Sequence, residues 1–596
     1  MNTHNDGPGS LRQAILDSSS GDTIAFDPRL DGSKIKLTDN QLSIDKTLTI
    51  DASSLTKGIT IDANARENDK RRILEVQEAD VQVTLTGITF VNGYGPNWDR
   101  EDIQHVGAPG GAILNNGILV LTNCSLINNR TSNGSYSWSH GDDAYAASGG
   151  GGPGGAIANT GEVTATNCIF KHNRTGRGNE GSFVAGDAGA GGAIFNGESG
   201  TFTTIQCIFS HNKAANGAKA EPEGWEGIGG EGGAIANGGR FALIDCTLSD
   251  NHAGDGSNPP GEIGGPGGHG GAISNWRNLT IVGCTFANNR AGDGGGGQPG
   301  GDGGAVRVGY SFSQCTFVNN RAGDGGVVGS FRGEGGSGGA ISKGFILSNC
   351  TIINNEAGLG GPDRPGKGGG VHGSETQISN CIISGNNAIE APDIYGQINE
   401  TGPNLISSEV PLLLAPLGDY GGPTHTMPPL SGSPVIDGGT TTDPKNTDQR
   451  GFLNFVDGDD SGTPAADLGA AEFQGLDAEF EITFHLDSDG DGITSGLERA
   501  LGSNPFVHDA QHPNSLRIFT VDPINGEALL TFGYLDNRVK LRLLRSSNLV
   551  DFETVIADSD TSQDFELNPE KGLIEIRDEI LPGDKALYRL EAFKKP

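Results

Sequence analysis

The feature that most constrains this sequence is one short phrase repeated eight times between Gly110 and Asn386. Each copy opens with two glycines, a small residue and Ile or Val. It then runs through alternating apolar and polar residues to a cysteine, as in GGAISNWRNLTIVGCTFANN at 270–289. The copies begin at Gly110, Gly154, Gly191, Gly232, Gly270, Gly303, Gly338 and Gly368. Self-similarity in fixed register indicates a solenoid.

The type of solenoid follows from the period of the apolar residues. The runs before each cysteine alternate with period two, which is typical of strands, and no helical stripe fits between the glycines and the cysteine. A phrase of roughly 18–22 residues is long enough for one coil of short parallel strands, stacked about 4.8 Å from the next. We therefore predict an all-β chain whose main body is a right-handed parallel β-helix, spanning 22–400.

Two residue types recur once per coil and are expected to form structural ladders along the stack. The cysteines are Cys124, Cys168, Cys207, Cys246, Cys284, Cys315, Cys350 and Cys381. The asparagines, five residues later, are Asn129, Asn173, Asn212, Asn251, Asn289, Asn320, Asn355 and Asn386. No CxxC pair occurs, so we expect free, inward-pointing thiols rather than disulfides or metal ligands. The asparagine amides are expected to bond from coil to coil at a corner.

Composition narrows the class of protein. The formal net charge of −34 argues against binding to nucleic acid or to an anionic membrane by bulk electrostatics. The sequence contains no run of about 18 apolar residues, which is the length that a membrane-spanning helix needs. The chain shows no signal peptide after Met1, but its architecture and composition lead us to expect an extracellular or bacterial cell-surface protein.

The sequence around the repeats predicts further elements. Residues 7–19 read as a short helix with Ser10 as N-cap, expected to cover the open end of the β-helix as a cap segment over 1–21. Glycine-rich insertions of about 12–24 residues leave each coil after the ladder asparagine, so they should gather on one side. They can be flexible linkers or ordered, extended strands that bond across the stack.

Several segments resemble parts of exported bacterial proteins. GGAI together with Phe286-x-x-Asn289 is similar to the repeats of polymorphic outer-membrane-type adhesins and other secreted β-helix proteins. GPGSLRQAILDS at 7–18 resembles the "CSLREA-like" N-terminal segment, although no cysteine precedes Ser10. Residues 403–473 resemble the "choice-of-anchor Q" segment, which implies that 401–475 closes the β-helix. The resemblance covers roughly half the chain and implies a fold rather than an activity.

The C-terminal part contains a calcium-binding pattern. DSDGDGITSGLE at 487–498 resembles a dockerin or thrombospondin-type half-hand and predicts Ca²⁺ in a linker over 476–510. Its expected ligands are Asp487, Asp489, Asp491, Ile493, Ser495 and Glu498. A second acidic cluster, at Asp457, Asp459 and Asp460, is a weaker metal candidate.

Alternating segments over 511–596 predict a small C-terminal β-sandwich. They resemble C-terminal domains of large exported proteins of aquatic bacteria, which suggests a part in export, attachment or carbohydrate contact.

Candidate ligand-binding residues fall into two groups. The residue after each ladder asparagine is basic in six of the eight copies: Arg130, Arg174, Lys213, His252, Arg290 and Arg321. These form either a cationic stripe for an anionic glycan or a solvated corner balanced by loop acids. Tyr136, Trp138 and Trp225 are candidate glycan contacts, because aromatic rings stack on sugars.

The sequence therefore predicts a secreted or cell-surface structural or adhesive protein, a component of a matrix, a fibre or an adhesin. The alternative is a protein that binds or cleaves extracellular polysaccharide, as a lyase or glycoside hydrolase. No acid, base and substrate clamp can be assembled from the sequence, so we assign no catalytic residue and lean against catalysis. Self-association into fibres is a further expectation.

Overall fold

The computed structural model describes residues 2–96, 106–135, 148–180, 183–440, 446–459 and 461–475, and beyond these the backbone of the strands between Arg517 and Lys594. The chain divides into two compact units. One contains Met1–Leu412, Leu417–Pro428 and Pro434–Glu472, and the other contains Leu413–Pro416, Pro429–Ser433 and Phe473–Pro596.

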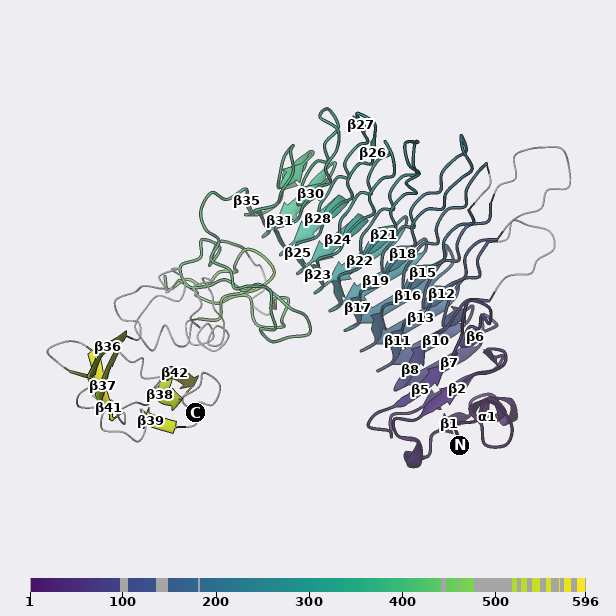
Figure 1. Ribbon diagram of the computed structural model, residues 1–596, viewed down its shortest axis with the longest axis horizontal. Coiled ribbons are helices and arrows are strands. Elements are labelled where there is room, and N and C mark those ends of the chain that lie inside the picture. The colour runs from purple at the N-terminus through teal and green to yellow at the C-terminus, as the bar shows by residue number, and fades with distance from the viewer. Residues whose placement is uncertain are drawn as a thin grey trace. The chain divides into compact units, whose positions relative to one another are not determined.

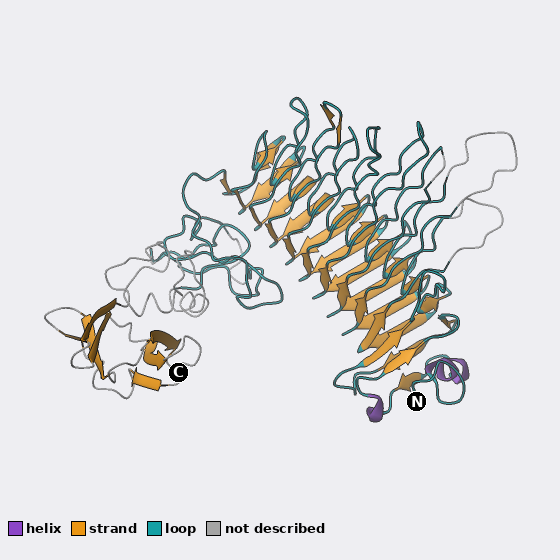
Figure 2. Cartoon of the chain, viewed as in Figure 1, coloured by secondary structure: helices purple, strands orange, loops and turns teal. Residues whose placement is uncertain are grey.

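The first unit is a parallel β-helix, as predicted, with two parallel sheets along its length (Figures 1 and 2). Its first sheet contains β1 (Thr23–Ala25), β3 (Leu42–Ile44), β4 (Leu48–Asp51), β6 (Leu74–Val76), β7 (Gln82–Thr86), β9 (Ile113–Asn115), β10 (Ile118–Thr122), β12 (Ile157–Asn159), β13 (Glu162–Thr166), β15 (Ile194–Asn196), β16 (Thr201–Ile205), β18 (Ile235–Asn237), β19 (Arg240–Ile244), β21 (Ile273–Asn275), β22 (Asn278–Val282), β24 (Val306–Ser313), β28 (Ile341–Ser348), β30 (Val371–His372), β31 (Thr376–Ser379), β33 (Ile394–Tyr395) and β34 (Ile398–Glu400).

The second sheet supplies the third side of each coil. It contains β2 (Lys34–Lys36), β5 (Ile59–Asp62), β8 (Ile88–Val91), β11 (Ser125–Ile127), β14 (Ile169–Lys171), β17 (Ile208–Ser210), β20 (Thr247–Ser249), β23 (Thr285–Ala287), β25 (Thr316–Val318), β29 (Thr351–Ile353), β32 (Ile382–Ser384) and β35 (Leu405–Ile406). Equivalent residues pair in register from coil to coil, for example Leu126 with Phe170 and then Phe209.

The N-terminal cap is as predicted. Helix α1 (Leu11–Asp17) begins after Ser10, whose hydroxyl accepts a hydrogen bond from Gln13 N at 3.1 Å. Leu11 and Ile15 are buried in the same core as the first strands. A 3-10 turn, η1 (Pro28–Leu30), follows β1.

Inside the coils, like residues stack on like. All eight cysteines are free and buried, which confirms the prediction of a thiol ladder. Aromatic rings also stack along the axis, with Phe170 and Phe209 centroids 4.6 Å apart and Phe286 and Phe317 at the same distance. Burial raises the pKa of Cys350 and Cys381, so these thiols stay protonated.

The predicted asparagine ladder runs unbroken from Asn129 to Asn386. Each Nδ2 donates to the Oδ1 of the next ladder asparagine; Asn212, for example, donates to Asn251 at 3.0 Å and also to the carbonyl of Phe170 at 2.8 Å. The last member, Asn386, donates to Asp393 at 2.8 Å. A second ladder, which was not among the predictions from the sequence, joins Asn115, Asn159, Asn196, Asn237 and Asn275 at the end of the short strands.

The glycine-rich insertions form an ordered layer on one side of the coils. Outgoing and returning arms alternate: Gly254 N donates to Gly230 O, Gly268 N to Gly254 O, and Gly292 N to Gly268 O, at 2.8–2.9 Å. A Cβ on Gly254 would lie 1.7 Å from the carbonyl oxygen of Ala215, so only glycine permits this approach. Of the two expectations for these loops, the ordered one is confirmed for the described residues. A short hairpin, β26 (Val327–Val328) and β27 (Phe331–Arg332), interrupts one insertion.

Residues 417–428, 434–440, 446–459 and 461–472, which we name the covering segment, cover part of the outer face of the second sheet rather than only following its last coil. Thr285 Oγ1 donates to His425 O at 2.5 Å, and Thr316 Oγ1 bonds to Gln449 Oε1 at 2.7 Å. The outward side chains of β23, β25, β29 and β32 are therefore buried. By contrast, the outward Ile169 and Ile208 are exposed on β14 and β17. The bounds of the closing segment, predicted at 401 and 475, remain predictions.

The strands near the C-terminus form two antiparallel sheets. One contains β36 (Arg517–Asp522), β37 (Glu527–Phe532), β41 (Leu573–Glu579) and β40 (Leu567–Asn568). The other contains β39 (Thr554–Asp558), β38 (Val539–Ser546) and β42 (Leu587–Lys594). Two antiparallel sheets are the components of the β-sandwich predicted for 511–596.

Replacing one rung of the asparagine ladder tests its contribution to stability. Asn212→Ala leaves the Phe170 carbonyl and the amides of Asn173 without their partner. We expect a loss of about 2–4 kcal/mol, because each buried polar group left unpaired costs roughly 1–3 kcal/mol. Guanidinium unfolding followed by circular dichroism measures the loss. Asn278→Ala, at an exposed strand position, is the control and should stay within about 0.5 kcal/mol of the parent; equal losses would contradict the ladder's role.

Glu472 makes the stability of the covering segment depend on pH. Burial, and next the charge of Asp467, raise the pKa of Glu472 to about 9. Between pH 5 and 9 the unfolded carboxyl is ionised while the folded one keeps its proton, so the protein should lose stability as pH rises. Glu472→Gln should flatten the fall in melting temperature across this range, measured by differential scanning calorimetry. The exposed Glu198→Gln serves as control, and parallel profiles for all three proteins would refute the assignment.

Candidate functional site

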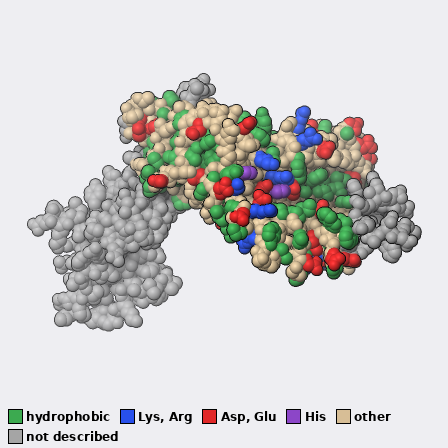
Figure 3. Space-filling model, turned by 90° about the horizontal axis from the view of Figure 1, so that it is seen from above, with side chains coloured by type: hydrophobic (Ala, Val, Ile, Leu, Met, Phe, Trp, Pro, Cys, Tyr) green, Lys and Arg blue, Asp and Glu red, His purple; other side chains and the backbone are tan. Residues whose placement is uncertain are grey.

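Charged side chains are concentrated on particular parts of the β-helix. In the face drawn in Figure 3, Lys, Arg and His side chains gather over the middle of the β-helix with some Asp and Glu among them, and other Asp and Glu side chains lie toward its ends. The predicted basic residues form a row along the stack. Parallel bridges join Tyr94, Arg130, Arg174, Lys213, His252, Arg290, Arg321, Glu356 and Asn387 in that order. The six predicted basic residues thus lie one above another at the root of the glycine layer.

In the C-terminal half of this row, each basic residue pairs with an acid three positions later. Arg321 Nη2 lies 2.8 Å from Asp324 Oδ2, and its Nε lies 3.1 Å from Glu356. Arg290 pairs with Asp293, and His252 Nε2 lies 3.6 Å from Asp255 Oδ1. For these three coils the interpretation of a balanced, solvated corner is the better one, because the loop acids neutralise the row.

The N-terminal half of the row lacks these acids. The position three residues after Arg130, Arg174 and Lys213 holds Asn133, Arg177 and Asn216 instead. Among the residues that the structure describes, no carboxylate lies within ion-pair distance of Arg174, Arg177 or Lys213. The break in the acid pattern therefore leaves three cations on two neighbouring coils without an ion-pair partner among the described residues, although Lys213 still interacts electrostatically with Asp255 at longer range.

These residues line a cavity of about 420 Å³, which we name the cationic pocket. Its lining consists of Glu67, Tyr94, Arg130, Thr131, Asn133, Arg174, Thr175, Arg177, Lys213, Ala215 and Asn216. Backbone bonds across the stack fix the positions of the basic residues: Arg174 N donates to Asn129 O, and Lys213 N donates to Asn173 O, both at 2.9 Å. The cations are thus mounted on the same corner that the asparagine ladder holds rigid.

One end of the pocket is formed by residues of an earlier coil. Arg130 lies over the ring of Tyr94 at 4.0 Å and 3.6 Å from Glu67 Oε2. The Tyr94 hydroxyl hydrogen-bonds to Glu67 at 3.1 Å, and burial raises the pKa of Tyr94 to about 12. The phenol therefore stays protonated at neutral pH and can donate a hydrogen bond. Arg130 is partly neutralised here, whereas Arg174, Arg177 and Lys213 form no ion pair with any residue in the described part of the chain.

None of the three glycan contacts predicted from the sequence is among the residues that line the cationic pocket. Tyr136 and Trp138 lie outside the described residues. Trp225 lies in a glycine-rich insertion, where its side chain is exposed and its backbone N donates to Phe183 O at 2.6 Å; it does not line the pocket. His172 and His211 adopt left-handed backbone conformations at the position that Asn92, Asn128 and Asn288 hold in other coils, which supports a structural role.

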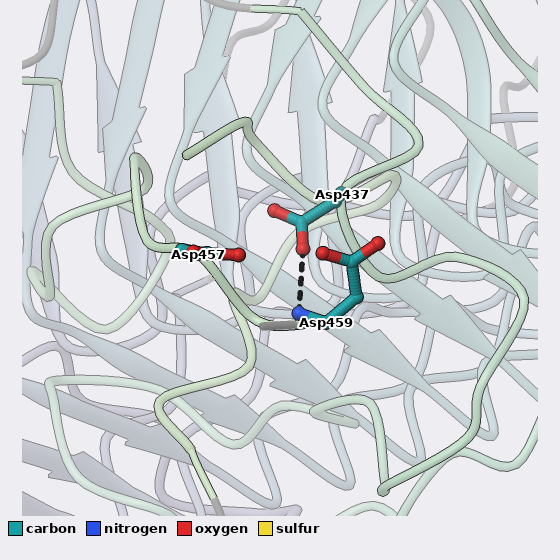
Figure 4. Close-up of side chains that lie close together, drawn as sticks. All are labelled: Asp437, Asp457 and Asp459. Atoms are coloured by element: carbon teal, nitrogen blue, oxygen red, sulfur yellow. Dashed lines mark hydrogen bonds between the residues drawn. The ribbon is translucent and has the colours of Figure 1, made fainter. Parts of the chain in front are cut away.

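Three carboxylates converge in the covering segment. Ligand atoms of Asp437, Asp457 and Asp459 lie within 4.8 Å of one another, and Asp437 Oδ2 accepts the backbone N–H of Asp459 at 2.8 Å (Figure 4). The sequence predicted two of them and missed Asp437, which lies 20 residues before Asp457. Ca²⁺ takes about six to eight oxygen ligands, which is more groups than these three carboxylates. The same carboxylates already accept several backbone hydrogen bonds. Asp460 and the predicted ligands between Asp487 and Glu498 lie outside the described residues.

No family model matches the sequence, and no curated protein matches it. Among solved structures, the chain is similar to tailspike protein 3 (TSP3, orf212) of bacteriophage CBA120, with 10% identity and a TM-score of 0.21. The alignment covers 68% of this chain, which spans about three-fifths (60%) of the tailspike chain. Among the described residues, none of the helices is long and apolar enough to cross a membrane. The fold and site thus define a parallel β-helix protein with a cationic pocket on one corner.

Proposed function

We propose that this chain is a secreted or cell-surface β-helix protein that binds anionic polysaccharide in the cationic pocket while its coils serve as a rigid structural or adhesive body. The observation that carries the proposal is the exchange of acids for Asn133, Arg177 and Asn216, so that Arg174, Arg177 and Lys213 line one cavity without an ion pair to any described residue. A row that served only to solvate a corner would keep its acids, as the next three coils do.

The chemistry of the lining suits carboxylated or sulfated sugars. Guanidinium groups bind carboxylate and sulfate oxygens with paired hydrogen bonds, and Asn133, Asn216 and Thr175 can bond to sugar hydroxyls. The spacing of stacked coils, about 4.8 Å, is close to the length of one extended sugar unit. Because the whole chain carries a charge of −34, a polyanion can be attracted only where basic residues are concentrated locally.

Removing two of these three cations should weaken this binding. For the double variant Arg174→Ala/Lys213→Ala we expect at least a tenfold loss of affinity for alginate or chondroitin sulfate, since each charge-assisted hydrogen bond contributes roughly 1.5–3 kcal/mol. Isothermal titration calorimetry at two salt concentrations measures the affinity, which should weaken as salt rises.

The matched control is Arg290→Ala/Arg321→Ala, which removes two basic residues of the same row whose charges are already neutralised. That variant should retain most of the parental affinity. Equal losses in both variants, or no binding by the parent, would refute the pocket's role. The same incubations report on the alternative of a polysaccharide lyase or hydrolase, because new reducing ends or the ultraviolet absorbance of unsaturated sugars would appear.

We further propose that Ca²⁺ bound at 487–498 stabilises the junction before the C-terminal strands. The support is the sequence pattern, in which Asp487, Asp489 and Asp491 offer carboxylates and Glu498 a bidentate ligand. Gly492 between them allows the sharp turn of such loops.

Removal of calcium should loosen the C-terminal part and leave the β-helix intact. With EGTA we expect faster tryptic cleavage after residue 475, at least severalfold, and unchanged protection of 22–400, both measured by mass spectrometry of the fragments. Asp487→Ala/Asp489→Ala should show the fast rate even with calcium present. Identical cleavage of the parent with and without EGTA would contradict the calcium site.

A further inference from the structure

A second surface, away from the cationic pocket in sequence, departs from the repeat. The short strands β9, β12, β15, β18 and β21 each end in an asparagine of the second ladder. In the next two coils Val308 and Lys343 occupy that place. The short strand there fuses with the following strand to give the eight-residue strands β24 and β28. The repeat is therefore changed in two adjacent coils, where a purely structural stack would keep it.

This departure has a conformational cost. Val308 and Lys343 have φ values of 61° and 62°, in the left-handed region. For a β-branched residue such as Val308 this conformation is strained, and strained backbone is concentrated at functional sites. Beside it, the buried Oγ of Ser342 has no hydrogen-bond partner among the described residues, which is rare in a folded protein. Strain and an unpaired hydroxyl occur together at the same two coils.

Aromatic side chains are exposed at these coils. Trp276, Tyr310 and Phe345 belong to three successive coils, and their side chains are 46%, 64% and 39% exposed. The Tyr310 and Phe345 ring centroids lie 6.1 Å apart with an angle of 37° between the planes. We name these three residues the aromatic platform. Tyr310 and Phe345 lie on β24 and β28, whereas Trp276 lies in the bend between β21 and β22. Exposed rings present apolar faces of the size of a sugar ring.

Polar residues lie side by side on the part of these coils that precedes the rings in sequence. Cα pairing places Ser274, Arg307, Ser342 and His372 side by side, with Arg307 three residues before Tyr310. Arg307 Nη1 donates to Glu231 Oε2 at 3.1 Å, and Ser274 Oγ donates to the same carboxylate at 2.6 Å. The Arg307–Glu231 pair is partly exposed, so it offers both donors and acceptors to hydroxyl groups of a ligand.

The electrostatics of this surface differ from those of the cationic pocket. Glu231 and Asp302 balance Arg307 and Lys343, and burial lowers the pKa of His269 and His372, which keeps both imidazoles neutral at neutral pH. His269 Nδ1 accepts the backbone N–H of Asp302 at 2.8 Å, which also requires an unprotonated Nδ1. The charges around these imidazoles are thus of both signs, unlike the basic row at the cationic pocket.

We propose that the aromatic platform and the adjoining Arg307–Glu231 pair form a second carbohydrate site, which binds a neutral polysaccharide running along the stack of coils. Sugar rings lie against Trp276, Tyr310 and Phe345, and their hydroxyls bond to Arg307 and Glu231. Because its residues and its ligand class differ from those of the cationic pocket, either site can fail without the other.

Affinity electrophoresis in native gels tests this site. Gels contain laminarin, xylan, mannan or hydroxyethylcellulose, and migration is compared with a polysaccharide-free gel. We expect retardation of the parent protein in at least one gel, and at least a tenfold loss of affinity for Tyr310→Ala/Phe345→Ala. Both side chains are exposed, so this variant should fold, which a thermal melt followed by circular dichroism checks.

Two controls separate the possible outcomes. Trp225→Ala removes an exposed aromatic side chain from a glycine-rich insertion and should leave retardation unchanged, as should Arg174→Ala/Lys213→Ala. No retardation of the parent in any of the four gels would overturn the proposal, and so would unchanged retardation of Tyr310→Ala/Phe345→Ala. Binding of alginate or chondroitin sulfate is measured separately, so the fate of the cationic pocket does not decide this result.

Discussion

The asparagine ladder is the interaction on which the rest of the structure depends. Each rung bonds to the backbone of the coil before it and to the side chain of the coil after it, as Asn212 does with Phe170 and Asn251. It thereby fixes both the distance and the register between coils at one corner. The basic row and the start of every glycine-rich arm follow directly after this corner. Because the ladder asparagines are buried, their amides depend on hydrogen bonds within the protein. The register between coils is therefore specified by these hydrogen bonds as well as by packing.

The glycine layer extends that register outward. Its arms have no side chains through which to pack, and their order comes from backbone bonds such as Gly254 N to Gly230 O. Glycine loses more conformational entropy than any other residue when it is ordered. The layer can form only because the ladder beneath already places the arms side by side. The presence of a rigid corner thus turns a composition typical of flexible linkers into regular structure.

The sequence predicts most of this fold because the repeat shows which residues occupy equivalent positions in successive coils. The cysteine and asparagine ladders and the row from Arg130 to Arg321 follow from the spacing of the repeat, and the capping helix follows from the N-cap residue Ser10. The second ladder also had a readable signal, because Asn115, Asn159, Asn196, Asn237 and Asn275 each stand five residues after the first glycine of their repeat. The cationic pocket had a readable signal, the replacement of the acid by Asn133, Arg177 and Asn216. Its other wall, Tyr94 and Glu67, comes from coils without the cysteine, which no repeat aligns. The contact of Thr316 with Gln449 joins residues 133 positions apart and has no local signature.

Because the coils stack at a fixed spacing, the distance between two positions along the stack can change only in steps of one coil. Arg174 and Tyr310 belong to different coils of one register, and every coil between them adds about 4.8 Å to their separation. Gain or loss of a whole coil by recombination would change that separation by one step, while both ladders and the glycine layer would still find partners. The distance between two surface features can therefore vary among related chains without redesign of either one, in a manner that a globular core does not allow.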